Sequence, residues 1–98
     1  MVINKTAEGD KLTLALQGRL DTTTAPQLEA ELKASVDDVK ELTFDFAELE
    51  YISSAGLRVL LSAQKTMTKQ GSMVVKNVNA DIMDVFELTG FADILTIK

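Results

Sequence analysis

The sequence contains no cysteine, no histidine and no tryptophan. Without cysteine the chain cannot form disulfides, thiolate metal sites or a thiol nucleophile. Without histidine it cannot build a Ser-His-Asp triad, and the G-x-S-x-G turn that presents a nucleophilic serine is also missing. Neither of the glycine-rich nucleotide fingerprints, the P-loop and G-x-G-x-x-G, occurs. These absences argue against an enzyme, and we expect no catalytic residue, no cofactor and no metal.

Positive charge is also in short supply, because 10 lysines and arginines face 15 aspartates and glutamates, for a net charge of -5. Nucleic acids and anionic membranes both require a basic face, so neither is expected as a partner. A protein partner remains compatible with this charge. No apolar run approaches the ~20 residues that span a bilayer, and the N-terminal residues do not resemble a signal peptide. We therefore expect a cytoplasmic protein.

The length of 98 residues and a hydrophobic content of 46% predict one domain over residues 1–98, with an aliphatic core. Alternating apolar residues predict strands at 2–6, 11–17, 42–46 and 72–76. Helical spacing predicts helices that follow Thr24, run from 54 to 70, and run from 81 to 89. The resulting fold class is α/β, with a mixed, mostly parallel sheet of four to five strands covered by helices chiefly on one face. Residues 94–97 either add a short strand or pack against the domain.

Capping and turn residues mark the expected ends of these elements. Thr24 and Gln27 form a predicted capping box at the start of the first helix. Its buried stripe is expected to be Leu28, Leu32, Val36 and Val39. Gly71 and Gly90 are expected to stop the second and third helices. After residue 17 the chain is expected to leave the sheet, and residues 48–50 are expected to bridge the third strand to the second helix.

The most informative stretch is Tyr51-Ile52-Ser53-Ser54-Ala55-Gly56, between a strand and a helix. The simplest interpretation is that Ser53 or Ser54 caps the helix. A cap does not require two serines, however, and a glycine in the first turn costs roughly 1 kcal/mol relative to alanine. Because the strands at 11–17 and 42–46 are expected to be parallel neighbours, their following loops should be adjacent. The residues expected to meet there are Asp21, Thr22, Thr23, Ser53 and Ser54.

Three chemistries are conceivable at this end of the sheet. A Ser-Lys dyad is conceivable, but no lysine lies close to Ser54 in sequence. Asp21 and Asp45 could make a weak divalent-metal pair, although Asp45 is more simply a polar residue on a strand. A serine hydroxyl at a helix N-terminus is a good phosphorylation site, because the helix start accommodates an anion.

These segments resemble the STAS domain, and within it a stand-alone anti-sigma factor antagonist, over essentially the whole chain. Residues 18–21 (Gly-Arg-Leu-Asp) resemble the family's glycine-x-leucine/isoleucine-aspartate. Residues 51–57 (Tyr-Ile-Ser-Ser-Ala-Gly-Leu), together with Asp45 and Phe46, resemble its central segment. Residues 85–91 (Val-Phe-Glu-Leu-Thr-Gly-Phe) are similar to its C-terminal helix and stop.

The resemblance implies a protein that binds an anti-sigma factor with serine kinase activity, releases a sigma factor, and is inactivated by phosphorylation until a phosphatase restores it. By position Ser54 matches the phosphoacceptor. The residues expected to contact the partner are Asp21, Thr22, Thr23, Ser53, Gly56 and Arg58. Ser53 replaces a frequent aspartate, which makes it a rival acceptor, Ala55 replaces a frequent serine or threonine, and Arg58 replaces a frequent small residue. The alternative is a STAS module of another system, either transporter-associated or a ligand-binding scaffold.

Overall fold

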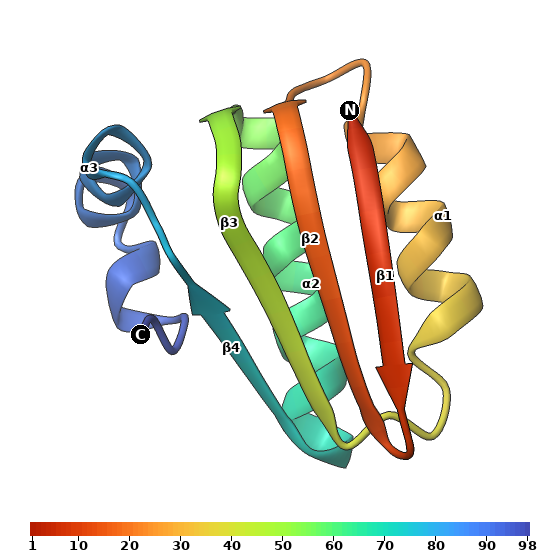
Figure 1. Cartoon of the computed structure of the whole chain (residues 1–98). Helices are drawn as coiled ribbons and strands as arrows, with labels where there is room; N and C mark the ends of the chain where they lie inside the picture. The colour runs from red at the N-terminus through yellow and green to blue at the C-terminus, as the bar shows by residue number, and fades with distance from the viewer.

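The computed structural model describes all 98 residues and contains one four-stranded sheet in the order β1-β2-β3-β4 (Figure 1). The hairpin partner β1 is antiparallel to β2, whereas β2, β3 and β4 run parallel. The mixed, mostly parallel sheet predicted from the sequence is confirmed. The strands are β1 (Val2–Glu8), β2 (Lys11–Leu20), β3 (Glu41–Ile52) and β4 (Ser72–Lys76), and the helices are α1 (Ala25–Ser35), α2 (Ser54–Gln70) and α3 (Ala80–Thr89).

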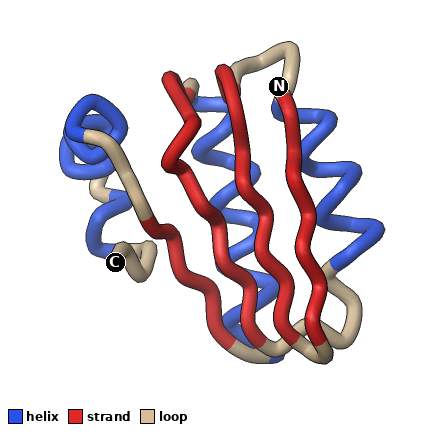
Figure 2. The backbone as a smooth tube through the Cα atoms, viewed as in Figure 1, coloured by secondary structure: helices blue, strands red, loops and turns tan.

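Helices α1 and α2 lie on the same face of the sheet, and α3 lies at its side, beyond the carboxyl end of β4 (Figures 1 and 2). The other face of β1, β2 and β3 has no helix over it. The alternating leucines and phenylalanines of β2 and β3 point toward the two covering helices and are buried, which gives one core cluster of 23 residues. No helix is both long and apolar enough to cross a membrane.

Helix α3 is attached to the sheet through its first and middle turns. Asn79 caps the helix by accepting from the Ile82 amide at 2.8 Å, and its side-chain amide donates to the Leu49 carbonyl at 3.0 Å. Phe86 is fully buried, with its ring centroid 6.4 Å from that of Phe46. The residues after α3 make a short 3-10 turn, Phe91–Asp93, and then one parallel bridge between Val75 and Ile97. The alternatives left open for residues 94–97 therefore resolve as a single bridge, and there is no fifth strand.

Three strands extend further than the sequence predicted, and the first of them, β1, runs to Glu8 rather than to residue 6. β2 continues to Leu20 and β3 to Ile52, so the chain does not leave the sheet at 18, and residues 48–50 belong to the strand. Register shifts lie between Ala15 and Gln17 and between Gly18 and Arg19. Gly18 adopts a φ of +97°, a conformation that favours glycine. These irregularities break the apolar alternation and hide the strand continuation from a period-two pattern.

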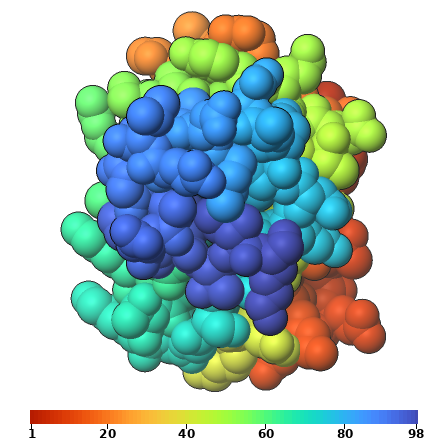
Figure 3. Space-filling view, turned by 90° about the vertical axis from the view of Figure 1, so that its left-hand side faces the viewer, coloured from red at the N-terminus to blue at the C-terminus, as the bar shows by residue number.

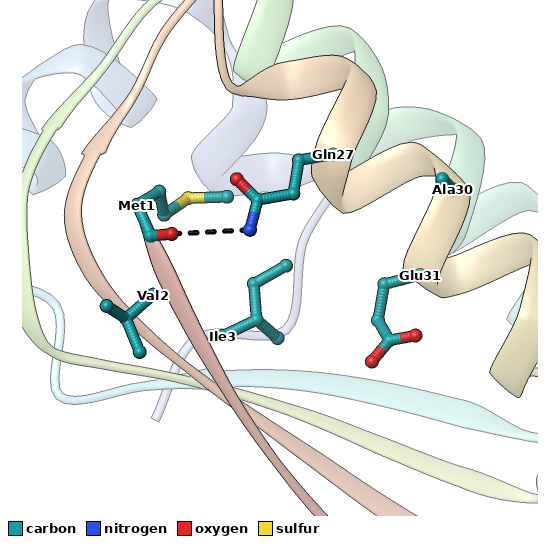
Figure 4. Close-up of a pocket in the computed structure, with 6 residues that line it drawn as sticks. All are labelled: Met1, Val2, Ile3, Gln27, Ala30 and Glu31. Carbon is teal, nitrogen blue, oxygen red and sulfur yellow. Dashed lines mark hydrogen bonds between the residues drawn. The ribbon is translucent and has the colours of Figure 1, made fainter.

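The predicted capping box at α1 is wrong, although Thr24 occupies the capping position. The Thr24 hydroxyl accepts from the Asp21 amide at 2.8 Å and donates to the Arg19 carbonyl at 2.8 Å. Gln27 instead donates to the Met1 carbonyl at 3.2 Å, across a hollow of about 570 Å³ between β1 and α1 (Figure 4). The hydrogen bonds that Thr24 makes within the preceding loop take the place of those that a capping box would make.

The two glycines that end helices are required for different reasons. Gly90 takes the left-handed conformation, with a φ of +83°, as the sequence predicted. Gly71 has an extended φ, and a Cβ there would collide with the Lys40 carbonyl oxygen. Gly71 is therefore required by close packing against the chain that leads into β3.

Candidate functional site

The two serines at the start of α2 have different environments. Ser53 is the N-cap, and its Oγ accepts from the Gly56 amide at 3.4 Å while its carbonyl accepts from Leu57 at 2.9 Å. Ser54 is the first helical residue, its side chain is exposed, and its hydroxyl makes no hydrogen bond within the chain. The structure thus gives the capping role to Ser53 and leaves the Ser54 hydroxyl free.

Gly56, in the first turn of α2, is buried against the ends of the two central strands. A Cβ at this position would lie 2.7 Å from Leu20 Cγ and 2.9 Å from Ile52 Cγ1. These distances are too short for any real Cβ contact, so the first turn can sit this low on the sheet only with glycine. The sequence predicted that Gly56 contacts the partner, but the atoms that approach it belong to this chain. A partner contact at Gly56 stays a prediction.

The loop between β2 and α1 is organised around the Asp21 carboxylate. Its Oδ1 accepts from the Thr23 hydroxyl at 2.7 Å, from the Thr23 amide at 3.0 Å and from the Thr24 amide at 3.2 Å. The Thr23 hydroxyl is the main cause that lowers the pKa of Asp21 below its ordinary value; partial desolvation opposes it, and the two amides reinforce it. Asp21 is consequently a charged acceptor that shapes its own loop.

The loops that follow β2 and β3 are joined, as the parallel arrangement predicted. The Ser53 amide donates to the Leu20 carbonyl at 2.9 Å. Thr22 and Arg58 line one shallow hollow of about 230 Å³ between the start of α1 and the first turns of α2. The structure therefore brings the expected partner-binding residues to one end of the molecule, with Gly56 beneath that surface.

One contact at this end was missed from the sequence. The guanidinium of Arg19 lies 4.2 Å from the centroid of the Tyr51 ring, and its Nε lies 3.7 Å from Asp21 Oδ2. Arg19 and Tyr51 are aligned across β2 and β3 only because the register shifts after Gly18. A regular register would not align them, so the only available signal was a cation and an aromatic residue near the ends of two neighbouring strands.

Asp45 does not join this end of the molecule as a free ligand. It accepts from the Asn77 side chain and from the Ala47 amide, both at 3.0 Å. The bond from Asn77 is the largest cause of the lowering of its pKa, followed by the bond from Ala47. No group of three or more acidic side chains could hold a metal ion. The polar strand residue is the interpretation that the structure supports.

Comparison with known proteins agrees with this architecture. The family model described as "Mlab, STAS domain" matches residues 3–96. The "Putative anti-sigma factor antagonist BtrV" of Bordetella bronchiseptica is 41% identical over 88 residues, which cover 88% of this chain and 76% of that protein. The "Anti-sigma-B factor antagonist" of Listeria monocytogenes is 33% identical over 98 residues, covering 96% of this chain and 84% of that protein.

The fold is shared with solved structures. The crystal structure of an anti-sigma factor antagonist from Mycobacterium paratuberculosis superposes with a TM-score of 0.88 at 23% identity, over 98% of this chain and 83% of the other. The strand order, the pair of helices on one face and the serines at the start of α2 together define an α/β domain of the STAS type. The chain belongs to the STAS-domain family, in its group of anti-sigma factor antagonists. The relatives at this level of identity are named for a regulatory role.

Proposed function

We propose that this protein, as an anti-sigma factor antagonist, binds an anti-sigma factor that is also a serine kinase, and that phosphorylation of Ser54 ends this binding. It acts in the cytoplasm by binding and without catalysis, and a phosphatase returns it to the active form. The observation that carries the proposal is the difference between the two serines. Ser53 is engaged as the cap, and Ser54 presents an unbonded, exposed hydroxyl.

The position of Ser54 favours a phosphate that leaves the fold intact. First-turn amides of a helix have no intrahelical acceptor, and the helix dipole favours an anion at this end. Only the Gly56 amide is taken by the Ser53 side chain. A phosphate on Ser54 can therefore receive hydrogen bonds from the helix start without displacing the cap.

The surroundings of Ser54 support a protein partner that contacts two loops at once. The loop with Asp21, Thr22 and Thr23 is joined to the start of α2 through the bond from Ser53 to Leu20. Arg58 is exposed on the next turn of the helix and faces the same hollow as Thr22. A kinase domain that reaches Ser54 would meet these side chains together, so they are the proposed binding surface.

The proposal is tested by incubating the protein with ATP and the candidate anti-sigma factor kinases of its own genome, and then measuring the intact mass. We expect a gain of one phosphoryl group that maps to Ser54. Ser54→Ala should abolish the gain in mass and keep binding to the kinase. Ser53→Ala is the matched control and should retain the gain in mass. Loss of the phosphate in Ser53→Ala, with retention in Ser54→Ala, would assign the acceptor to Ser53.

A further inference from the structure

Helix α2 carries a charge opposite in sign to the rest of the chain. It contains Arg58, Lys65 and Lys69 and no acidic residue, in a protein of net charge -5. None of these three cations forms an ion pair; the pairs in the structure use Lys5, Lys11, Arg19 and Lys33. Three unpaired cations on one helix are therefore available to a ligand.

The cations are aligned with the proposed acceptor serine. At about 100° per residue, Ser54, Arg58, Ser62, Lys65 and Lys69 fall within an arc of about 80°. All five side chains are exposed, and the buried residues of α2 lie on the opposite side. We call this set the α2 ridge. It runs for about 22 Å along the helix at 1.5 Å per residue.

A groove borders the ridge at its C-terminal half, with two apolar residues, Leu61 and Ile94, among polar and charged ones. It has a volume of about 560 Å³ and is lined by Leu61, Gln64, Lys65, Thr68, Lys69 and Ile94. This lining includes two cations and no anion, and Ile94 is 47% exposed. Figure 3 looks onto α3 and the C-terminal residues in blue, with the green to teal side chains of α2 along the left edge.

The groove also contains an acceptor without a donor. Gln64 Oε1 is buried and has no hydrogen-bond partner. The orientation of the Gln64 side chain follows from its neighbour Thr68. The Thr68 hydroxyl donates its hydrogen to the backbone carbonyl of Gln64 at 2.8 Å, so Thr68 Oγ1 must accept from the side-chain Nε2 of Gln64, at 3.1 Å. An unpaired buried acceptor is destabilising, and the Gln64 side chain would have to turn before an N–H group of a ligand could reach this oxygen.

We infer that the α2 ridge and its groove dock an acidic, amphipathic segment of the anti-sigma factor, an inference that rests on the proposed function. The carboxylates of this segment face Arg58, Lys65 and Lys69. Its apolar side chains pack on Leu61 and Ile94. The charge complementarity is local, since the binding surface is basic on an otherwise acidic protein, and it predicts a partner surface of negative sign.

In this arrangement a phosphate on Ser54 weakens binding of the partner in two ways. Ser54 and Arg58 are four residues apart on the ridge, a spacing at which opposite charges on a helix interact. A phosphate on Ser54 pairs with Arg58 and so removes one cation from the docking surface. It also places negative charge opposite the acidic segment of the partner, which repels it.

The test uses the kinase identified by the phosphorylation assay, immobilised, with association and dissociation rates measured at low and physiological salt. The Lys65→Glu/Lys69→Glu variant should associate about tenfold more slowly and lose most of the salt dependence, because steering charges act on the association rate. Ile94→Ser should mainly accelerate dissociation. Lys40→Glu is the matched control: Lys40 is exposed, unpaired and outside the ridge, and its kinetics should stay within about twofold of wild type. Melting curves confirm that each variant folds.

A second measurement separates the two proposals. Amide chemical shifts of the ¹⁵N-labelled protein are followed on addition of a synthetic amphipathic peptide with a glutamate-rich polar face, and of its lysine-rich counterpart. Wild-type kinetics for both the Lys65→Glu/Lys69→Glu and the Ile94→Ser variants would overturn the docking surface and leave the proposed function intact. If no kinase binds but the acidic peptide shifts α2 and Ile94, the proposed function fails and the surface stands. Equal shifts with both peptides, none with either, or ridge-dependent binding to duplex DNA would overturn the inference.

Discussion

The starts of α1 and α2 lie at the same end of the sheet and both carry hydroxyl side chains, but these hydroxyls have different hydrogen-bond partners. Before α1, the hydroxyls of Thr23 and Thr24 are both used, one by the Asp21 carboxylate and one by the Arg19 carbonyl. Before α2, Ser53 alone caps the helix and Ser54 has no partner. The start of α2 thus presents an exposed, unbonded hydroxyl on its first helical residue, whereas two of the three threonine hydroxyls before α1 have partners within the chain.

The largest effect is expected from phosphorylation of Ser54 at the start of α2. Phosphorylated Ser54 adds roughly 1.5 to 2 negative charges at neutral pH. Affinity for the kinase partner should fall on the order of a hundredfold or more, since each 1.4 kcal/mol corresponds to a factor of ten. Circular dichroism and the melting temperature should stay nearly unchanged. Calorimetric titration of the two forms measures the difference, and Ser54→Asp should reproduce it only in part. Unfolding upon phosphorylation would show that the α2 start is not an independent surface.

The second-largest effect is expected from a substitution that raises α2 off the strands. Gly56→Ala places a methyl group against Leu20 and Ile52, and overpacking of this kind typically destabilises by about 1–3 kcal/mol. Urea denaturation should show the loss. Ser62→Ala, on the exposed side of the same helix, is the control and should change stability by less than about 0.5 kcal/mol. A Gly56→Ala protein of wild-type stability would mean that the helix start shifts freely.

The two serines should differ in stability as well as in modification. Ser53→Ala removes the cap of α2 and should destabilise the protein by about 1 kcal/mol. Ser54→Ala removes no hydrogen bond and should change stability by less than about 0.5 kcal/mol. Thermal or urea unfolding of the matched pair checks this. Equal losses would indicate that both hydroxyls cap the helix.

The smallest effect is expected on the stability in acid of the loop before α1, which is organised around Asp21. The pKa of Asp21 is lowered from its ordinary value of 3.8 in the folded state. The carboxylate therefore contributes stability that is present above pH 3.8 and is lost as the pH falls through the lower folded-state pKa. Replacing Asp21 by asparagine should flatten this part of the acid-unfolding curve. The pKa of Asp45 is lowered too, so Asp45→Asn should flatten the curve separately. Acid titrations with an unchanged slope in Asp21→Asn would contradict the assignment.

The sequence predicted the architecture because hydrophobic spacing determines it. The strand pairing, the span of α2 and the left-handed stop at Gly90 were all confirmed. Most of the features it missed depend on contacts between distant segments, and one, the bonding of Thr24, depends on the conformation of its own loop. Strand β3 continues past Phe46 because Leu49 and Ile52 are buried, and Gly71 is required by the Lys40 carbonyl. The capping pattern at Thr24 was outweighed by bonds to Arg19 and Asp21, which no local pattern reveals.

The candidate site was predictable to the same degree. Parallel strand order correctly placed the Asp21 loop beside Ser53 and Ser54. Which of the two serines caps α2 and which keeps an unbonded hydroxyl was not predictable, because either hydroxyl can accept from a first-turn amide. The burial of Gly56 was not predictable, since the sequence does not show how low the first turn of α2 lies on Leu20 and Ile52, and its contact with a partner stays a prediction.

The seating of Gly56 on the strand ends bears on how quickly the protein can exchange partners. A serine mounted on a turn that is packed directly on the sheet is held in one geometry before any encounter. Such a preformed surface loses little conformational entropy when it is captured, and it requires no slow rearrangement before capture or after release. The lifetime of each complex is then set by its dissociation rate. For the proposed kinase and phosphatase, the rate of exchange is then limited by how fast each complex dissociates.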